Sequence, residues 1–220
     1  MKPVHKLCKL KEWSTPASLY PDGKVGKARL KTANYTRGQY QCYGIKGFDF
    51  FQAVRPLPIK SLQVAGKTWM VDDPPHWWAM EEHATFYRGH VVVAGLGLGL
   101  IVHTLAACPD VERITVVEIE PDVITLVQPH LPPSAKVEIV AGDFWDWEGQ
   151  PDGVFYDLFV GDGFTLAAEA LRTMLELRER FPGATTLRIH GFNNAKLWEM
   201  TEEIAHAGRL AWQEFWGRAL

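Results

Sequence analysis

The residue types best suited to chemistry in this 220-residue chain stand where apolar runs end. The run Val91 to Ala94 is followed by the glycine-rich turn Gly95-Leu-Gly-Leu-Gly99, a second run ends at Glu118, and a third ends at Gly142-Asp143. Glycines allow a backbone to approach a ligand that a Cβ atom would exclude. A carboxylate after the second strand of a nucleotide-binding fold can accept ribose hydroxyls, and one after the third can accept the exocyclic amine of adenine. The set favours nucleoside binding.

Each of these signals also has a purely structural reading. The glycine turn could serve tight packing alone, and its third glycine comes one residue too early for the dinucleotide-binding fingerprint. Glu118 alone could be a solvated carboxylate at a strand end, a reading that suits Glu120 better because Glu120 lies beyond the strand. Phe144 could pack on a base or in the core. Three matching strand ends in chain order give a stronger signal than any one of them.

The elements that must position these residues alternate between strand and helix from His90 onward. Such alternation predicts an α/β, Rossmann-like, doubly wound and mostly parallel sheet, in which ligands bind beyond the carboxyl ends of the strands. The expected strands are 91–94, 114–118, 136–141, 157–161 and 185–192. The expected helices are 100–107, one opened by Pro121, an amphipathic one through Leu166, Ala170, Met174, Leu177 and Phe181, and one marked by Leu197, Met200 and Ile204; residues 210–216 are expected to add an antiparallel strand.

The N-terminal third has a different texture. It is rich in glycine, proline and aromatic residues, and short alternating runs at 39–43, 48–52 and 67–71 indicate hairpin strands. Asp72-Asp73-Pro74-Pro75 reads as a closing turn. We therefore expect a small strand-rich cap over residues 1–85 and a Rossmann-like domain over residues 86–220.

Composition excludes several classes of protein. A formal net charge of −3 disfavours a general nucleic-acid binder, which would need a basic face. The three cysteines, Cys8, Cys42 and Cys108, lack metal-ligand spacing, so neither a disulfide framework nor a metal site is expected. The N-terminus lacks the apolar core of a signal peptide, and the apolar run from Val91 is interrupted by glycines, as in a buried strand, turn and helix. We expect a cytoplasmic protein with no membrane span.

From Val91 to Asp162 the chain resembles the class I methyltransferase fold, and most closely its spermidine-synthase-like branch. Three segments carry the resemblance: VERITVVEIEPDVI at 111–124, KVEIVAGD at 136–143 and YDLFVGD at 156–162. The resemblance covers roughly the last 130 residues well and the N-terminal region only loosely, as a small cap.

The resemblance implies that the cofactor is S-adenosylmethionine or its decarboxylated form. Glu118 would hold the ribose, Asp143 the adenine, and Asp162 would be the catalytic residue beside the reacting centre. From the residues alone, Asp162 follows the apolar run Leu158-Phe-Val, where a carboxylate could orient or deprotonate an amine, or it could cap the next helix. Asp157 is expected at the far start of that strand in a structural role. The implied cofactor-binding residues are Gly95, Leu96, Gly97, Gly99, Glu118, Ile119, Gly142, Asp143 and Phe144.

Two departures from the family bear on the reaction. Spermidine synthases carry an aspartate in the glycine turn and a second one shortly after the catalytic one, whereas this chain has Leu98 and Gly163-Phe164-Thr165. An aminopropyl acceptor would lose two counter-charges, which is costly in a closed site. Most methyltransferases place an acid just before the glycine turn, where this chain has Val93. We therefore favour a methyltransferase; the alternatives are an aminopropyltransferase and an inactive nucleoside-binding module.

The acceptor is not identified by these residues. A small molecule or a protein side chain fits the weakly acidic chain better than nucleic acid does, and because synthases of this branch commonly pair, a homodimer is an expectation from the resemblance. His190 and Asn193 flank the end of the fifth strand, near the acceptor, whereas His103 is expected to be packed. The segment His76-Trp77-Trp78 could form an aromatic lid or bury the seam between cap and sheet.

Overall fold

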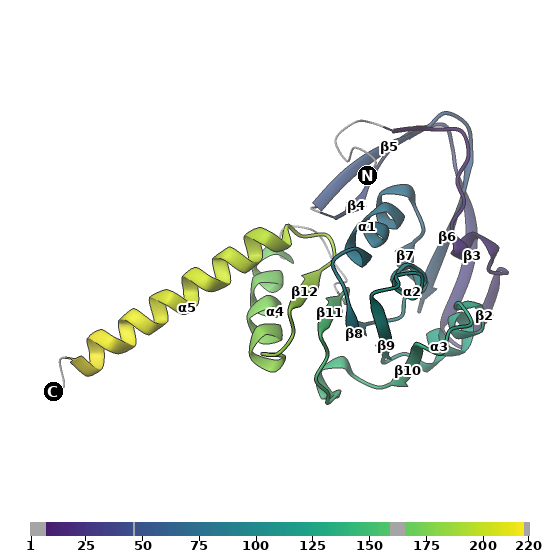
Figure 1. Ribbon diagram of the computed structural model, residues 1–220. Helices are drawn as coiled ribbons and strands as arrows, with labels where there is room; N and C mark the ends of the chain where they lie inside the picture. The colour runs from purple at the N-terminus through teal and green to yellow at the C-terminus, as the bar shows by residue number, and fades with distance from the viewer. Residues whose placement is uncertain (1–7, 46, 159–165, 218–220) are drawn as a thin grey trace.

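The computed structural model describes residues 8–45, 47–158 and 166–217. Within these ranges a strand-rich N-terminal part leads into alternating strands and helices (Figure 1). The elements in chain order are β1 (Cys8–Leu10), the 3₁₀ helix η1 (Pro16–Leu19), β2 (Gly23–Val25), β3 (Ala28–Tyr35), β4 (Gly38–Gly44), β5 (Gly47–Ala53), β6 (Leu57–Val64), β7 (Lys67–Val71), α1 (Pro74–Ala84), β8 (Gly89–Ala94), α2 (Leu100–Ala106), β9 (Val111–Glu118), α3 (Pro121–Val127), η2 (Gln128–His130), β10 (Val137–Ala141), η3 (Phe144–Asp146), β11 (Gly153–Tyr156), α4 (Leu166–Arg180), β12 (Thr186–Ile189) and α5 (Asn194–Gly217).

A five-stranded parallel sheet runs in the order β10-β9-β8-β11-β12. Counted by their succession along the chain, these strands have the order 3-2-1-4-5, which is the doubly wound arrangement. The chain leaves β8 toward β9 on one side and later returns to β11 on the other, so the strand order reverses at β8. The predicted Rossmann-like α/β fold is confirmed, and the reversal marks where a ligand crevice is expected.

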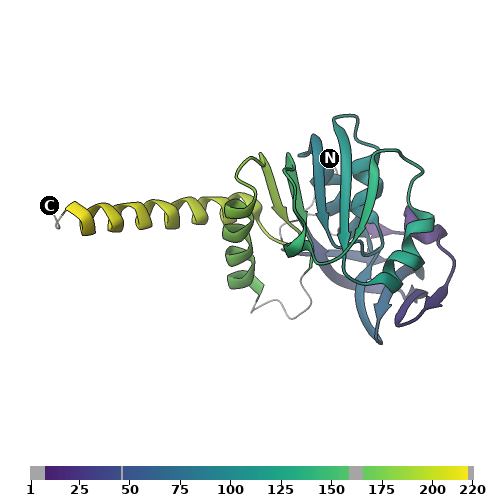
Figure 2. The same cartoon turned by 90° about the horizontal axis from the view of Figure 1, so that it is seen from below.

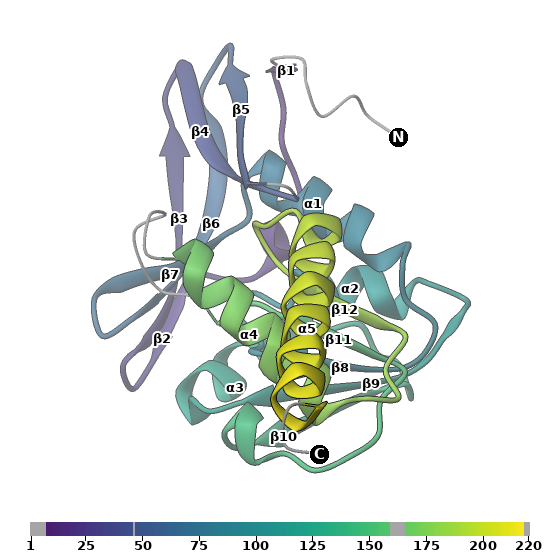
Figure 3. The same ribbon diagram turned by 90° about the vertical axis from the view of Figure 1, so that its left-hand side faces the viewer.

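Alternation of side chains along β8 divides the core into two layers. Val91 and Val93 belong to a hydrophobic cluster with α1, α2 and α3, whereas Val92 and Ala94 belong to a second cluster with α4 and the start of α5. This is the pattern of a strand whose two faces are both covered. Figure 3 looks onto α4 and α5 in front of the sheet, and Figure 2 shows the same two-sided arrangement from below.

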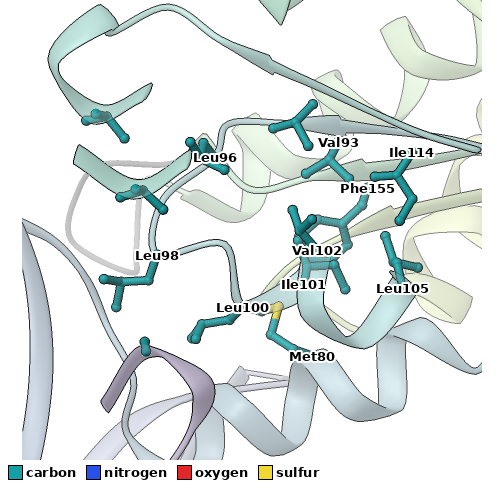
Figure 4. Packing of buried hydrophobic residues seen from close by; sticks show 14 of the residues in the cluster. Met80, Val93, Leu96, Leu98, Leu100, Ile101, Val102, Leu105, Ile114 and Phe155 are labelled. Atoms are coloured by element: carbon teal, nitrogen blue, oxygen red, sulfur yellow. The ribbon is translucent and has the colours of Figure 1, made fainter. Parts of the chain in front are cut away.

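The N-terminal part forms two small sheets that share the core of the parallel sheet. β2-β3-β6-β7 is antiparallel, and β1-β5-β4 joins the hairpin β4–β5 to β1, so the predicted hairpin strands are confirmed. The first hydrophobic cluster runs without a break from Leu30 and Leu62 of the antiparallel sheet to the parallel sheet. Figure 4 shows Met80 of α1 with Ile101, Val102 and Leu105 of α2 and with Val93, Ile114 and Phe155 of the sheet. The division at residue 85 remains a prediction about folding units, since this core crosses it.

The fourth strand does not lie at the predicted residues 157–161. β11 is Gly153–Tyr156, and its four residues are buried between β8 and β12. Leu158, expected in a buried run, is 38% exposed. The prediction was wrong because the neighbouring apolar run after Asp157 has the same character as the true strand, and apolar character alone does not fix the register of a strand.

Two predicted ends were also wrong. Residues 210–216 continue α5, which extends away from the body in Figures 1 and 2, because a single glycine without a second turn residue does not end a helix. Asp72 to Pro75 do not close a turn but begin α1, with the Asp73 side chain accepting from the His76 amide at 3.1 Å and prolines in the first two helical positions. Across the described residues, no helix combines the length and apolar character needed to cross a bilayer.

Candidate functional site

A cavity of about 680 Å³ opens at the carboxyl ends of the parallel strands. Its volume is in the range typical of small-molecule sites, roughly 300–1,000 Å³. The sheet contributes one part of its wall, and α1, β4 and β7 contribute the rest. Gly99 is not among its lining residues. The predicted cofactor-binding residues that do line it are Gly95, Leu96, Gly97, Glu118, Ile119, Gly142, Asp143 and Phe144.

The glycine turn packs closely against neighbouring side chains. Gly97 has φ +53°, and a Cβ atom there would lie 2.6 Å from Sδ of Met70, a β7 residue that also lines the cavity. The same sulfur accepts the Leu98 amide at 3.2 Å, while the Leu98 side chain is fully buried in the core. Gly99 has φ +70° and is the N-cap of α2, where a Cβ would lie 2.4 Å from Leu131. Packing therefore accounts for Gly99, whereas Gly97 faces both Met70 and the cavity.

Glu118 ends β9 and is held rigidly. It is only 5% exposed, and its two oxygens accept the backbone amides of Leu96 and Glu120, each at 2.8 Å. One bond fixes the glycine turn of β8 and the other fixes the start of the loop after β9. Because each carboxylate oxygen has two lone pairs, this arrangement orients the side chain and still leaves acceptor capacity.

Glu120 differs from its prediction as a solvated carboxylate. It is 6% exposed, its side chain caps α3, and it forms an ion pair with Lys27 at 2.5 Å. The prediction was wrong because the antiparallel N-terminal sheet covers this position, and the sequence near Glu120 carries no sign of that contact.

The third strand end combines an exposed carboxylate with a buried ring. Asp143 is exposed, and one of its oxygens accepts the Trp145 amide at 2.9 Å. Phe144 is 2% exposed and packs edge-on to Tyr156 in the second hydrophobic cluster, which matches the core-packing reading. Ile119, in contrast, is 63% exposed beside the cavity. We call Glu118, Ile119, Gly142, Asp143 and Phe144 the strand-end group.

Opposite features meet on another part of the wall. His76 from α1, Asp157 directly after β11 and His190 directly after β12 line the cavity together. Their ligand atoms all lie within 4.8 Å of one another, and the two imidazoles stack with ring centroids 4.6 Å apart. Both histidines are more than nine-tenths buried. We call these three residues the His–Asp cluster.

The His–Asp cluster lacks hydrogen bonds that its burial would call for. Within the described part of the chain, His76 Nε2, Asp157 Oδ2 and both ring nitrogens of His190 are buried without a partner. Burial, together with the charge of His190, lowers the pKa of His76 to about 3. Burial likewise lowers the pKa of His190 to about 4, and it raises the pKa of Asp157 to about 6 against the opposing effect of His76. At neutral pH both imidazoles are therefore uncharged.

Asp157 was expected at the far start of its strand, and that prediction was wrong. Because β11 ends at Tyr156, Asp157 stands at the carboxyl end of the strand, on the cavity wall. Asp162, the predicted catalytic residue, lies outside the described residues. His190, predicted near the end of the fifth strand, does lie there, and β12 stops one residue before it.

The other candidates divide between structure and site. His103 donates to or accepts from the Tyr20 hydroxyl at 2.7 Å, consistent with a packed role. Asn193 Oδ1 accepts the Lys196 amide at 3.3 Å at the start of α5. In α1, Trp78 lies edge-on to Trp13 at 5.9 Å, as expected of aromatics in the seam between cap and sheet, whereas His76 faces the cavity.

Sequence reasoning missed Asp157 and the N-terminal contribution to the site. The usable signal for Asp157 was the rule already applied to Glu118 and Asp143, namely an acidic residue immediately after a buried strand, but it was applied four residues too late. No local signal connects Met70, Tyr35 or Cys42 with the cavity, because each arrives from the antiparallel part of the chain. Cys42 and Cys108 are free thiols.

Comparison with known proteins gives partial likenesses only. No protein-family model matches the chain, and no curated protein gives a significant match. A putative RNA methyltransferase from Pyrococcus horikoshii is 16% identical over 36% of this chain and 39% of its own, with a TM-score of 0.31. A DhpI–SAH complex is 23% identical over 45% and 47%, with a TM-score of 0.34. Precorrin-6y C5,15-methyltransferase from Geobacter metallireducens is 16% identical over 50% and 60%, with a TM-score of 0.36.

In each of these three pairs the matched stretch spans less than two thirds of the other protein. The fold assignment rests on the strand order of this chain.

Proposed function

We propose that the chain is an S-adenosylmethionine-dependent methyltransferase with a spermidine-synthase-like core. The observation that carries the proposal is the cavity at the carboxyl ends of β8, β9 and β10, whose wall holds a glycine turn, a buried glutamate and an exposed aspartate in chain order. A Rossmann-like sheet binds nucleotides at this edge.

In this proposal the strand-end group receives the adenosine. Glu118 accepts the ribose hydroxyls with the lone pairs that the amides of Leu96 and Glu120 do not use. Asp143 accepts the adenine amine, and Ile119 covers one face of the base, where its exposed side chain would gain apolar contact. Gly95 and Gly97 lie beside the methionine part, and binding there requires the Met70 side chain to turn away from Gly97.

The reaction needs little beyond alignment of donor and acceptor. A lone pair of the acceptor forms a bond to the methyl carbon while the electrons of the carbon–sulfur bond return to sulfur, which leaves S-adenosylhomocysteine. The acceptor proton passes to a base, the role proposed for Asp162. The acceptor is proposed to be a small molecule or a protein side chain, and a homodimer stays an expectation from the resemblance.

Calorimetric titration of tag-free protein with S-adenosylmethionine, S-adenosylhomocysteine, decarboxylated S-adenosylmethionine and methylthioadenosine tests the proposal. We expect the first two to bind, and Glu118→Gln to weaken both about tenfold or more, since it places an amide donor where an acceptor is needed. Asp146→Asn, on exposed η3, is the matched control and should bind like the wild type. Absence of binding by both compounds would overturn the proposal.

Turnover separates the two enzymatic readings. Incubation with methyl-labelled S-adenosylmethionine and fractionated small molecules or proteins should transfer label and release S-adenosylhomocysteine. Tighter binding of the decarboxylated compound with release of methylthioadenosine would indicate aminopropyl transfer. Binding without transfer to any acceptor, together with an Asp162→Asn variant that behaves like the wild type in every assay, would indicate a binding module.

A further inference from the structure

The His–Asp cluster offers three ligand atoms of the kinds that transition metals prefer. His76, Asp157 and His190 come from three separate elements, α1 and the loops after β11 and β12, and converge on one cavity wall. Two imidazole nitrogens and one carboxylate oxygen form the donor set of many zinc and non-haem iron sites with open coordination positions.

Burial without partners is the second observation. A buried polar atom with no hydrogen bond typically costs roughly 1–3 kcal/mol. In the described ranges four such atoms belong to this cluster, two of them on His190. Contrast Glu118 on the same cavity, where both oxygens accept backbone amides. A cation bound between the three side chains would satisfy the atoms that the fold leaves unpaired.

We propose that His76, Asp157 and His190 bind one first-row transition-metal dication, with its remaining coordination positions open to the cavity. The imidazoles are uncharged at neutral pH, the form in which histidine ligates a metal. Calcium and magnesium are disfavoured because they prefer all-oxygen ligand sets. The three donor atoms lie within 4.8 Å of one another, whereas ligands about 2.1 Å from a tetrahedral ion are roughly 3.4 Å apart. Small side-chain rotations close that difference.

The open positions would face the part of the cavity that the strand-end group does not line. A small molecule with an oxygen or nitrogen donor is therefore the class of ligand that the metal would hold. The proposal does not depend on S-adenosylmethionine, since none of the three ligands belongs to the strand-end group. It departs from the expectation, based on cysteine spacing, that the chain has no metal site.

Metal titration of tag-free protein stripped with EDTA tests this proposal directly. We expect one equivalent of Co²⁺ to produce visible d–d absorption, Zn²⁺ to displace it with the same stoichiometry and raise the melting temperature, and Mg²⁺ to do neither. His76→Gln, Asp157→Asn and His190→Gln should each weaken Co²⁺ binding at least about tenfold. Circular dichroism establishes that each variant is folded.

Two matched controls lie outside the cavity. His206→Gln removes an exposed histidine of α5 and Asp146→Asn an exposed aspartate of η3, and neither should change Co²⁺ binding. Absence of saturable Co²⁺ and Zn²⁺ binding to the wild type would overturn the proposal, whether or not any variant folds. So would binding that all three cluster variants retain at full strength. Cofactor titrations in EDTA report on the proposed methyltransferase separately.

Discussion

The strand-end group and the His–Asp cluster share one cavity but differ in how their polar atoms are satisfied. Glu118 is buried and bonded to two backbone amides of its own sheet edge. His76 and His190 are as deeply buried, yet ring nitrogens on both lack partners among the described residues. The first group is complete within the chain and only needs a ligand that matches it. The second is incomplete, and its burial makes sense if something else supplies the missing bonds.

The largest effect that would sharpen this comparison is expected from Glu118→Ala. Removing the carboxylate leaves the amides of Leu96 and Glu120 buried without acceptors, at roughly 1–3 kcal/mol each. Urea denaturation should show a loss of unfolding free energy of about 2 kcal/mol or more. The matched control is Glu138→Ala, which removes an exposed ion pair with Arg113 on the neighbouring strand and should cost less than about 1 kcal/mol. Equal losses would mean that Glu118 is not the organising residue of this edge.

The opposite sign is expected on the other wall. In EDTA, His190→Leu should raise the unfolding free energy by about 1–2 kcal/mol, because it replaces two unpaired nitrogens with an apolar side chain in a buried position. His103→Leu, which removes a histidine bonded to Tyr20, should lower it by about 1 kcal/mol. If both variants are destabilised to the same degree, the nitrogens of His190 are not a burden on the fold.

Gly97→Ala distinguishes packing from ligand approach at the glycine turn. The φ of +53° costs an alanine about 1–2 kcal/mol, and the added Cβ meets Met70 Sδ. Met70→Ala in the same chain should relieve the steric part of the loss in stability. If the double variant recovers stability but still binds S-adenosylmethionine weakly, Gly97 is required for the ligand; recovery of both would assign it to packing alone.

The smallest effect is expected at Ile119. Because its side chain is 63% exposed, Ile119→Ser should change the unfolding free energy by no more than about 0.5 kcal/mol. Losing apolar contact with a bound base should nevertheless weaken S-adenosylmethionine about three- to tenfold in calorimetry. Ile204→Ser, on exposed α5, should alter neither quantity. An unchanged affinity in Ile119→Ser would place the base elsewhere.

The sequence by itself determined the sheet and one wall of its cavity. Val91 to Ala94, the glycine turn, Glu118 and Asp143 were identified because strand ends in a parallel sheet converge at one edge, so each residue could be placed from its local pattern. The amphipathic spacing of α4 and the proline at the start of α3 worked for the same reason. These signals depend on near neighbours in the chain.

Only the tertiary structure decided the rest. The register of β11, and with it the place of Asp157, depends on pairing with β8 and β12, which apolar character does not encode. His76 reaches the cavity because α1 packs between the N-terminal sheets and the parallel sheet, and Met70 because β7 lies against the glycine turn. Contacts between segments this far apart leave no local pattern, so the wall with the unpaired histidines could be found only where the chain had folded around it.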